Sequence, residues 1–255
     1  YGKVLVEGTP QPIRDEIKIN NPVKLVSPSS LKRYRQEDAQ SKDSSPKNEL
    51  KKQDSIVNSL EISERPTIAL IDCGAKASIM RILLDAGAEV ISMPWDYPLN
   101  NIEYDGLFLS NGPGDPKACT KTIAHLRHAL GETRPIFGIC LGTQLLALAA
   151  GADTYKLKYG HRGQNQPAIE IKSRRCYITS QNHGYAVLED SLPPGWEPWF
   201  LNGNDGTIEG IRASNAPFRA VQFHPEGCPG PRDTQFLIEE FLHEVAEAKR
   251  QKRQA

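Results

Sequence analysis

The residue with the clearest chemical potential is Cys140, which lies between Gly138 and Gly142 where an apolar run ends and a helical pattern begins. A nucleophile flanked by glycines two residues away on each side is the pattern of a nucleophile elbow, a sharp strand-to-helix turn that exposes the reactive atom. Glycines lack a Cβ and therefore let strand and helix approach each other closely. A lone cysteine is more often a small buried hydrophobe, but the two glycines favour a thiolate nucleophile that the helix N-terminus stabilises.

A histidine that could serve this nucleophile lies in His224-Pro225-Glu226, directly after the apolar residues 218–223. A thiol nucleophile needs a proton acceptor, and the histidine needs a carboxylate that fixes its tautomer and stabilises the imidazolium. His224 and Cys140 both follow predicted strands, so we expect them at the carboxyl edge of one sheet, where the sites of open α/β folds gather. An isolated histidine is more often structural, and the two motifs together predict a catalytic triad of Cys140, His224 and Glu226.

A glycine-rich loop, residues 109–116, follows another predicted strand. It has neither the G-x-G-x-x-G pattern nor the Lys-Ser/Thr of a P-loop, which argues against nucleotide binding. Exposed backbone N–H groups near Gly112, together with that of Leu141, could instead stabilise the oxyanion of a tetrahedral intermediate.

A second polar stretch, Ser180 to Tyr185, is expected on a loop after a strand. His183 within it could be a second base, but a structural or substrate-positioning role is the favoured interpretation.

The elements that must position these residues alternate between strand and helix from Thr67 to Ala150, which indicates a parallel, doubly wound sheet. After Gly151 the pattern changes to closely spaced strands, and a final helix begins near Thr234. The sequence therefore predicts an α/β fold whose doubly wound, mostly parallel sheet has antiparallel additions. The expected strands are residues 67–71, 90–93, 106–109, 135–139, 168–171, 176–179, 206–211 and 220–223, and the expected helices are 79–87, 122–130 and 145–150.

Composition divides the chain into four segments. Residues 1–27 are predicted to be an extended connecting arm, and residues 28–66 a flexible polar insertion with too few apolar side chains to offset the entropy of ordering. Residues 67–247 form the predicted catalytic domain, and 248–255 a charged tail or linker.

Charge and cysteine content restrict the partners and the compartment. Lysine plus arginine equals aspartate plus glutamate at 31 each, so no net field would recruit nucleic acid or an anionic membrane. Five cysteines without a CxxC pair suit a reducing compartment, which predicts a cytoplasmic protein, or an organellar one if a targeting signal has been removed. The chain begins at Tyr1, so we expect it to be part of a longer polypeptide, and no apolar run approaches the length of a membrane span.

Six motifs together resemble one family. They are Asp72-Cys-Gly-x-Lys76, Leu109-Ser-Asn-Gly-Pro-Gly-Asp-Pro116, Phe137-Gly-Ile-Cys-Leu-Gly-x-Gln-Leu-Leu-Ala147, Tyr159-Gly-x-Arg-Gly-x-Asn-Gln-Pro167, Ser180-Gln-Asn-His-Gly184 and Phe223-His-Pro-Glu226. With these motifs, residues 67–243 resemble the class I glutamine amidotransferases, and most closely the glutaminase part of carbamoyl-phosphate synthetase. The motifs that end at Pro167 and Gly184 distinguish that part from anthranilate, GMP and CTP amidotransferases.

The resemblance implies that Cys140 is the nucleophile, His224 the general base and acid, and Glu226 its orienting partner. It also implies that seven residues contact bound L-glutamine: Gly112, Gly114, Leu141, Gln144, Asn182, Gly184 and Tyr185. No cofactor is expected in this chain, because ATP and metal would bind the synthetase partner, which is either a large subunit or a fused domain. The family has a further N-terminal domain before the position of Tyr1, which would contribute a glutamine contact and part of the synthetase interface.

Two other interpretations remain open. The chain could be another class I amidotransferase or a γ-glutamyl hydrolase with the same elbow and triad, or it could be a catalytically weak regulatory module. The sequence does not distinguish pyrimidine from arginine synthesis, nor a fused polypeptide from a free subunit.

Overall fold

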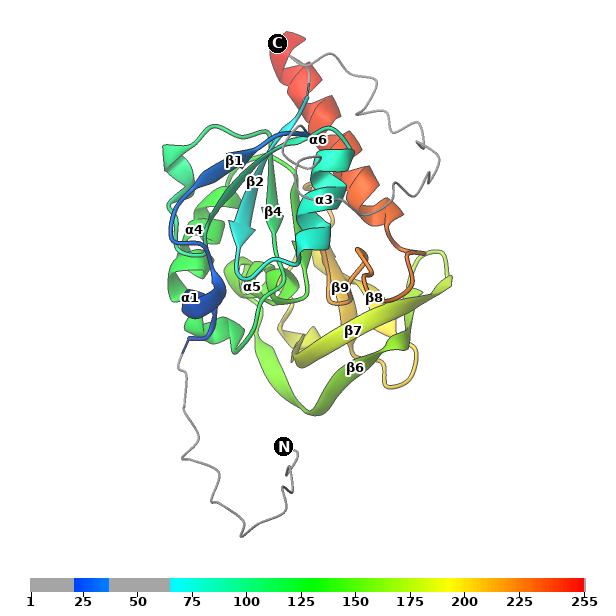
Figure 1. The fold of residues 1–255 in the computed structure, drawn as a ribbon. Coiled ribbons are helices and arrows are strands. Elements are labelled where there is room, and N and C mark those ends of the chain that lie inside the picture. Colours follow the sequence, from blue (N-terminus) through cyan, green and yellow to red (C-terminus); the bar gives the residue numbers. More distant parts are fainter. Residues whose placement is uncertain (1–20, 37–64, 255) are drawn as a thin grey trace, which may run out of the picture.

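A single sheet of ten strands, in the order β1-β3-β2-β4-β5-β10-β9-β8-β6-β7, organises the computed structural model (Figure 1). The structure describes residues 21–36 and 65–254. The sheet combines a parallel half, which is covered by helices, with an antiparallel half.

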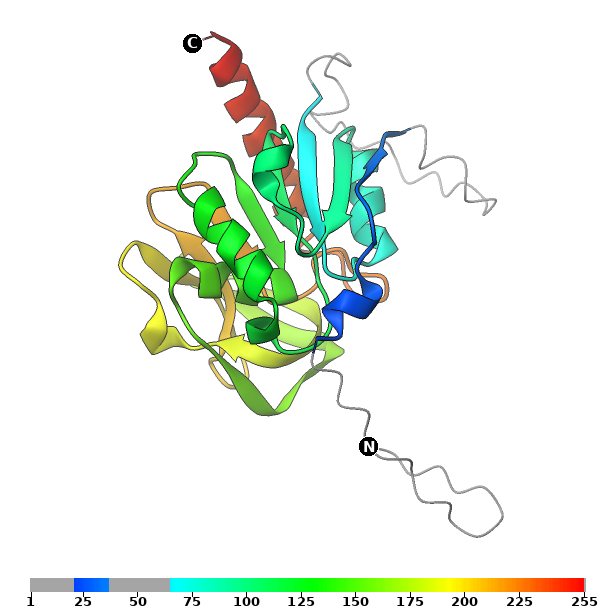
Figure 2. The ribbon, with the colours of Figure 1, turned by 90° about the vertical axis from the view of Figure 1, so that its left-hand side faces the viewer.

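The parallel half contains β2 (Thr67–Asp72), β3 (Glu89–Pro94), β4 (Gly106–Leu109), β5 (Ile136–Ile139) and β10 (Phe218–Val221). Helices α3 (Ala77–Asp85) and α6 (Phe236–Gln254) pack on one face, and α4 (Thr120–Ala129) and α5 (Leu141–Ala150) on the other (Figures 1 and 2). Strands buried on both faces read as continuous apolar runs, which is why the sequence predicts these five strands and the helices between them. The doubly wound α/β fold is confirmed.

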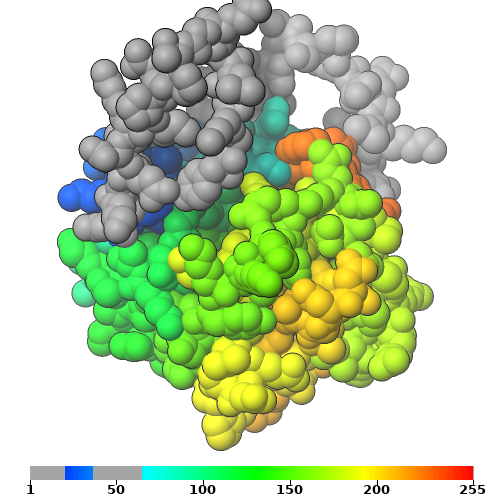
Figure 3. All heavy atoms as spheres, turned by 90° about the horizontal axis from the view of Figure 1, so that it is seen from below, coloured from blue at the N-terminus to red at the C-terminus, as the bar shows by residue number. Residues whose placement is uncertain are grey.

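The antiparallel half contains β9 (Ile208–Ala213), β8 (Trp196–Asn202), β6 (Thr154–Glu170) and β7 (Cys176–Val187). The long β6–β7 hairpin sweeps across the lower part of the molecule in Figure 1, and its yellow-green atoms occupy the middle of the face seen from below in Figure 3. Strand β8 is not among the predicted strands, because Pro198 lies within it and proline argues against an interior strand position.

The polar stretch Ser180 to Tyr185 lies within β7, so its placement on a loop is wrong. Gln181 and His183 are buried whereas Asn182 between them is exposed. This is the two-residue period of a strand, but it is carried by polar side chains on both faces, which conceals it from a hydrophobicity pattern.

The first described residues also differ from the expectation. Helix α1 (Val23–Val26) and strand β1 (Lys32–Tyr34) replace the ends of the predicted extended arm and polar insertion, and β1 pairs antiparallel with β3. Val23 is buried, and the Ser27 hydroxyl donates to the Asp72 carbonyl at 2.6 Å. These few anchors order a polar segment. The rest of the arm and insertion, residues 1–20 and 37–64, lies outside the described residues.

Three single-turn 3-10 helices and a longer C-terminal helix complete the part of the chain that the structure describes. The short helices are η3 (Leu99–Asn101), η4 (Pro116–Ala118) and η5 (Glu189–Ser191). Helix α6 continues to Gln254, so the described part of the predicted tail, 248–254, is helical, and Lys249 bonds the Asp105 carboxylate at 2.9 Å. Within the described ranges, no helix is long and apolar enough to cross a membrane.

Candidate active site

Four neighbouring parallel strands bring the site together. In sheet order β2, β4, β5 and β10 are adjacent, and their carboxyl ends lead to Lys76, Gly112, Cys140 and His224 respectively. Residues separated by up to 148 positions therefore meet at one edge, as the sequence predicts for Cys140 and His224.

Cys140 forms the turn between β5 and α5. Its φ is +56° and its ψ −102°, and its N–H donates to the Val221 carbonyl at 2.8 Å. A positive φ is uncommon for a residue with a side chain and persists where surrounding structure enforces it. The expected elbow is present, with the thiol at the N-terminus of α5.

The glycines on either side of Cys140 have no room for a side chain. A Cβ on Gly138 would lie 2.8 Å from the Gly142 carbonyl carbon, and a Cβ on Gly142 would lie 2.5 Å from the Leu109 carbonyl oxygen. Both contacts are with backbone atoms, which cannot rotate away. The two glycines are therefore required for the close approach of α5 to β4 and β5.

Gly142→Ala is expected to lower the free energy of unfolding by about 1–3 kcal/mol, because the added methyl overpacks a rigid contact. Urea denaturation measures this loss. Gly131→Ala is the control, since its Cβ would meet only the His128 carbonyl oxygen, at 3.2 Å. Equal losses in the two variants would contradict the account.

His224 and Glu226 form a buried pair beside Cys140. The His224 Nδ1 lies 2.7 Å from Glu226 Oε1, and the His224 ring also hydrogen-bonds Cys140. His224 is 7% exposed and Glu226 1%. The three residues thus form a continuous thiol–imidazole–carboxylate chain, which is the order of groups that a nucleophile, a base and an orienting group require.

The surroundings of His224 and Glu226 favour the charged form of each side chain. Burial opposes an imidazolium, but hydrogen bonds to Cys140 and Glu226 outweigh it and raise the pKa of His224 to about 10. Burial also opposes the Glu226 carboxylate, but His224 and Lys76 outweigh it and hold the pKa of Glu226 below its usual value. His224 is therefore prepared to hold the proton that the thiol gives up.

Lys76 completes this arrangement, although in the sequence it has no role beyond its place in a motif. Its Nζ lies 2.9 Å from Glu226 Oε1 and donates to the Gly227 carbonyl at 2.6 Å. No local pattern relates two residues 150 positions apart. Only the adjacency of the β2 and β10 edges reveals the contact.

Lys76→Met is expected to reduce the free energy of unfolding by about 1–3 kcal/mol at pH 7, since the buried Glu226 loses a charged partner. The pKa of Glu226 is lowered in the folded protein, so this stabilisation is present above the unfolded value of about 4.5 and is lost as pH falls through the folded value. The difference from wild type should therefore shrink below about pH 4.5. Denaturant titrations at pH 7 and pH 3 measure it.

Lys121→Met is the matched control, because Lys121 bonds Asp96 at 3.0 Å on the exposed surface. Its expected loss is below about 1 kcal/mol. A Lys76→Met loss that is equally large at both pH values would contradict the role given to Glu226.

A cleft of about 590 Å³ opens beside Cys140 and His224. Of the seven residues expected to contact glutamine, Gly112 and Asn182 line this cleft, whereas Gly114, Leu141, Gln144, Gly184 and Tyr185 are not among its lining residues. The remaining lining residues are Gly74, Lys76, Asn111, Pro113, Arg162, Gly163, Gln164, Ser180, Gln181 and Pro229. The β6–β7 hairpin supplies six of the fourteen residues, which the sequence indicated only through two polar motifs.

Residues outside the cleft lining support its walls. The Gln144 side-chain amide donates to the Tyr185 carbonyl at 3.0 Å and to Gln222 Oε1 at 3.1 Å, which connects α5 to β7. Gly114 has a φ of +96°, and Pro22 occupies the space that a Cβ would need. Gly112, which does line the cleft, is also closely packed, because a Cβ there would lie 2.4 Å from the Cys73 carbonyl oxygen.

Comparison with known proteins places these features in a family. The model for "Glutamine amidotransferase class-I" matches residues 69–244, which include all three triad positions. The multifunctional protein pyr-3 of Neurospora crassa is 53% identical over 180 residues, which are 70% of this chain and 10% of that protein. The arginine-specific small chain of carbamoyl phosphate synthase from Aspergillus clavatus is 50% identical over 185 residues, which are 71% of this chain and 41% of the relative.

Solved structures agree on the fold. A putative GMP synthase subunit from Thermoplasma acidophilum superposes with a TM-score of 0.66 at 21% identity, over 75% of this chain and 98% of that one. A glutamine amidotransferase from Thermotoga maritima gives 0.53 at 18% identity, over 73% and 86% of the two chains. The family model spans more than half of the sequence and includes the elbow and its base, and the chain therefore belongs to the class I glutamine amidotransferases.

Proposed function

We propose that this chain is the glutaminase part of a carbamoyl-phosphate synthetase, and that it hydrolyses L-glutamine to glutamate and ammonia. The observation that carries the proposal is the thiol–imidazole–carboxylate chain of Cys140, His224 and Glu226 beside a cleft. The two relatives described above, at 50% identity or more, point to the same role through their names. The chain spans a tenth and about two fifths of their lengths, so the activity of the whole assembly is part of the proposal.

The proposed reaction proceeds in two halves. The Cys140 thiolate attacks the carboxamide carbon of the glutamine side chain, and a new C–S bond forms as the carbonyl oxygen becomes an oxyanion. His224 then gives its proton to the departing nitrogen, so ammonia leaves and a γ-glutamyl thioester remains. His224 next takes a proton from water, which attacks the thioester and releases glutamate and the Cys140 thiolate. Glu226 keeps the imidazole oriented throughout.

Binding roles follow from position. We assign the backbone N–H groups of Gly112 and Leu141 to the oxyanion, because Leu141 is the first residue of α5 and Gly112 packs against its side chain. Asn182 faces the cleft and would contact the substrate directly. The other expected contacts, Gly114, Gln144, Gly184 and Tyr185, would act from the cleft wall or its rim.

The proposed partner is a synthetase subunit or fused domain that consumes the ammonia. ATP and metal would bind that partner, and this chain would need no cofactor, nucleic acid or membrane for glutamine hydrolysis. The cysteine content supports a cytoplasmic or organellar protein.

The test compares glutamine hydrolysis by the chain alone with hydrolysis in the presence of the synthetase. Glutamate release that requires Cys140 supports the proposal, and stimulation by the synthetase identifies the partner. No hydrolysis under either condition would favour the regulatory module. Activity that only a different amidotransferase partner stimulates would favour another member of the family.

A further inference from the structure

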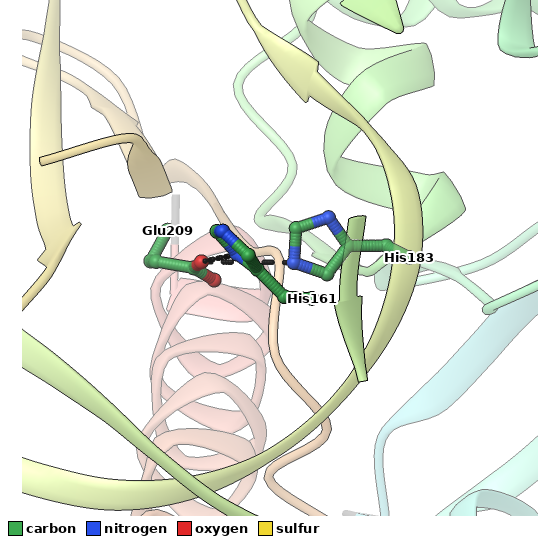
Figure 4. A group of neighbouring side chains, drawn as sticks. All are labelled: His161, His183 and Glu209. Carbon is green, nitrogen blue, oxygen red and sulfur yellow. Dashed lines mark hydrogen bonds and ion pairs between the residues drawn. The ribbon is translucent and has the colours of Figure 1, made fainter. Parts of the chain in front are cut away.

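A buried polar cluster lies in the antiparallel half of the sheet, outside the triad. It consists of His161 on β6, His183 on β7 and Glu209 on β9 (Figure 4), and we call it the His–His–Glu cluster. Glu209 is 0% exposed and His183 5%. The two imidazole rings lie edge to face with their centroids 4.8 Å apart.

The Glu209 carboxylate is the acceptor that the two rings share. Its Oε1 lies 2.9 Å from His161 Nδ1 and 3.6 Å from His183 Nε2, and it also accepts from the Asn202 amide at 3.1 Å. The other oxygen, Oε2, is buried and has no hydrogen-bond partner among the described residues. A buried carboxylate is costly unless it is paired, so the two histidines are what allow Glu209 to remain charged.

His161 is held between two carboxylates. Its Nε2 lies 2.9 Å from Asp205 Oδ2, opposite the bond to Glu209. The Glu209 hydrogen bond, opposed by burial and assisted by Asp205, raises the pKa of His161 to about 9. His161 and Glu209 therefore form a partly buried ion pair at neutral pH.

His183 links Glu209 to β7, the strand that lines the cleft. Its Nδ1 lies 2.9 Å from the Tyr185 carbonyl and its Nε2 3.3 Å from Gln181 Oε1. Gln181 and Asn182, its neighbours on β7, line the cleft, as do Arg162 and Gly163 on β6.

The backbone pairing of the β6–β7 hairpin is weak where the hairpin forms the cleft wall, so side-chain contacts are needed to hold it there. Only three consecutive residue pairs join β6 to β7 there, His161 with His183, Arg162 with Asn182, and Gly163 with Gln181, and the register shifts on both sides of them. Strand β6 pairs with β8 at residues 168–170 but not at these positions. Glu209 belongs to β9, which is separated from β6 by β8 in the sheet order. Glu209 therefore connects this short stretch of the hairpin to β9 through side-chain contacts.

A metal ion is the competing interpretation, because histidine and carboxylate atoms within 4.8 Å of one another are typical ligands. Two features indicate that hydrogen bonds, and not a metal ion, hold these side chains together. Both nitrogens of His161 already face carboxylates, and Asn202 donates to Glu209 Oε1, the oxygen that the two rings share.

We propose that Glu209 is a positioning residue for glutamine binding, which acts through His161 and His183 to hold the cleft-lining stretch of the β6–β7 hairpin in place. This inference rests on the proposed glutaminase function. The proposed role of Glu209 is not a catalytic one, because none of the three residues of the His–His–Glu cluster lines the cleft.

The test uses Glu209→Gln, which keeps the shape of the side chain and removes its charge. Iodoacetamide alkylation of Cys140 reports on the triad, and the glutamine concentration that protects Cys140 reports on binding. We expect an unprotected alkylation rate within about twofold of wild type and a protective concentration raised about tenfold or more. The KM for glutamine should rise similarly with little change in kcat. Asp205→Asn should give a smaller shift in the same direction.

Glu197→Gln is the matched control, since Glu197 on β8 bonds Arg212 at 2.7 Å on the surface of the same sheet. It should change none of these quantities. Amide hydrogen exchange provides a readout that needs no glutamine: Glu209→Gln should accelerate exchange in residues 161–163 and 181–183 but not in α5.

Unchanged exchange in the hairpin would overturn the proposal, as would parallel losses of alkylation rate and glutamine protection. Zinc that remains bound at one equivalent after desalting, and is lost in Glu209→Gln, would overturn it in favour of a metal site. If glutamine fails to protect wild-type Cys140 while the variant still loosens the hairpin, the proposed substrate is wrong and the anchoring role stands.

Discussion

Cys140→Ser is expected to lower kcat for glutamine hydrolysis by about 10⁴-fold or more, which is the scale on which loss of a nucleophile acts in comparable triads. Serine keeps the size of the side chain, but its hydroxyl is not ionised near neutral pH, so no covalent intermediate forms at a useful rate. The fold should be unchanged, because the elbow backbone depends on Gly138 and Gly142 rather than on sulfur. Glutamate release measures the loss, and isothermal titration with glutamine tests whether the cleft still binds substrate.

The same cysteine should be the site of covalent capture. A reactive glutamine analogue with a diazoketone in place of the carboxamide should add one equivalent, and peptide mass spectrometry should place the adduct on Cys140. Cys176→Ser is the control, because Cys176 is an exposed free thiol at the start of β7. An adduct on another residue, or a Cys140→Ser variant with wild-type activity, would show that the nucleophile has been misassigned.

His224→Asn is the second substitution with a large expected effect, a decrease in kcat of about 10³–10⁴-fold. The variant loses both the group that holds the thiol proton and the acid that protonates departing ammonia. Because hydrogen bonds to Cys140 and Glu226 raise the pKa of His224 to about 10, the imidazolium form persists through neutral pH. Alkylation of Cys140 by iodoacetamide near pH 7 should therefore also slow in the variant, since the cysteine loses its charged partner.

His128→Asn is the control for this experiment, since His128 lies on the exposed side of α4. It should leave hydrolysis and alkylation unchanged. If His224→Asn slowed glutamine hydrolysis but not alkylation, His224 would be an acid for the leaving group and not the proton acceptor of Cys140.

Local sequence determined the parts of the fold that depend on short-range patterns. Apolar runs predict β2, β3, β4, β5 and β10 because strands buried on both faces need side chains of one kind. The glycines around Cys140 predict the elbow because only residues without a Cβ fit there, and His224-Pro-Glu226 supplies its own carboxylate two residues away.

Patterns made of polar residues were less informative. Strand β7 carries polar side chains on both faces, so its middle has the sequence pattern of a loop. Strand β8 was not predicted because it contains a proline, which is unusual inside a strand. The short elements α1 and β1 are ordered by a few contacts, such as those of Val23 and Ser27, that no composition average detects.

The tertiary structure alone decided which distant residues act together. Lys76 reaches Glu226 because β2 and β10 end at the same edge of the sheet. Glu209 reaches His161 and His183 because the fold brings these two residues of the β6–β7 hairpin close to β9. The physical reason is the same in both cases: the sequence specifies each side chain and its local element, but a buried charge acquires its partner only when the sheet order brings separate strands side by side.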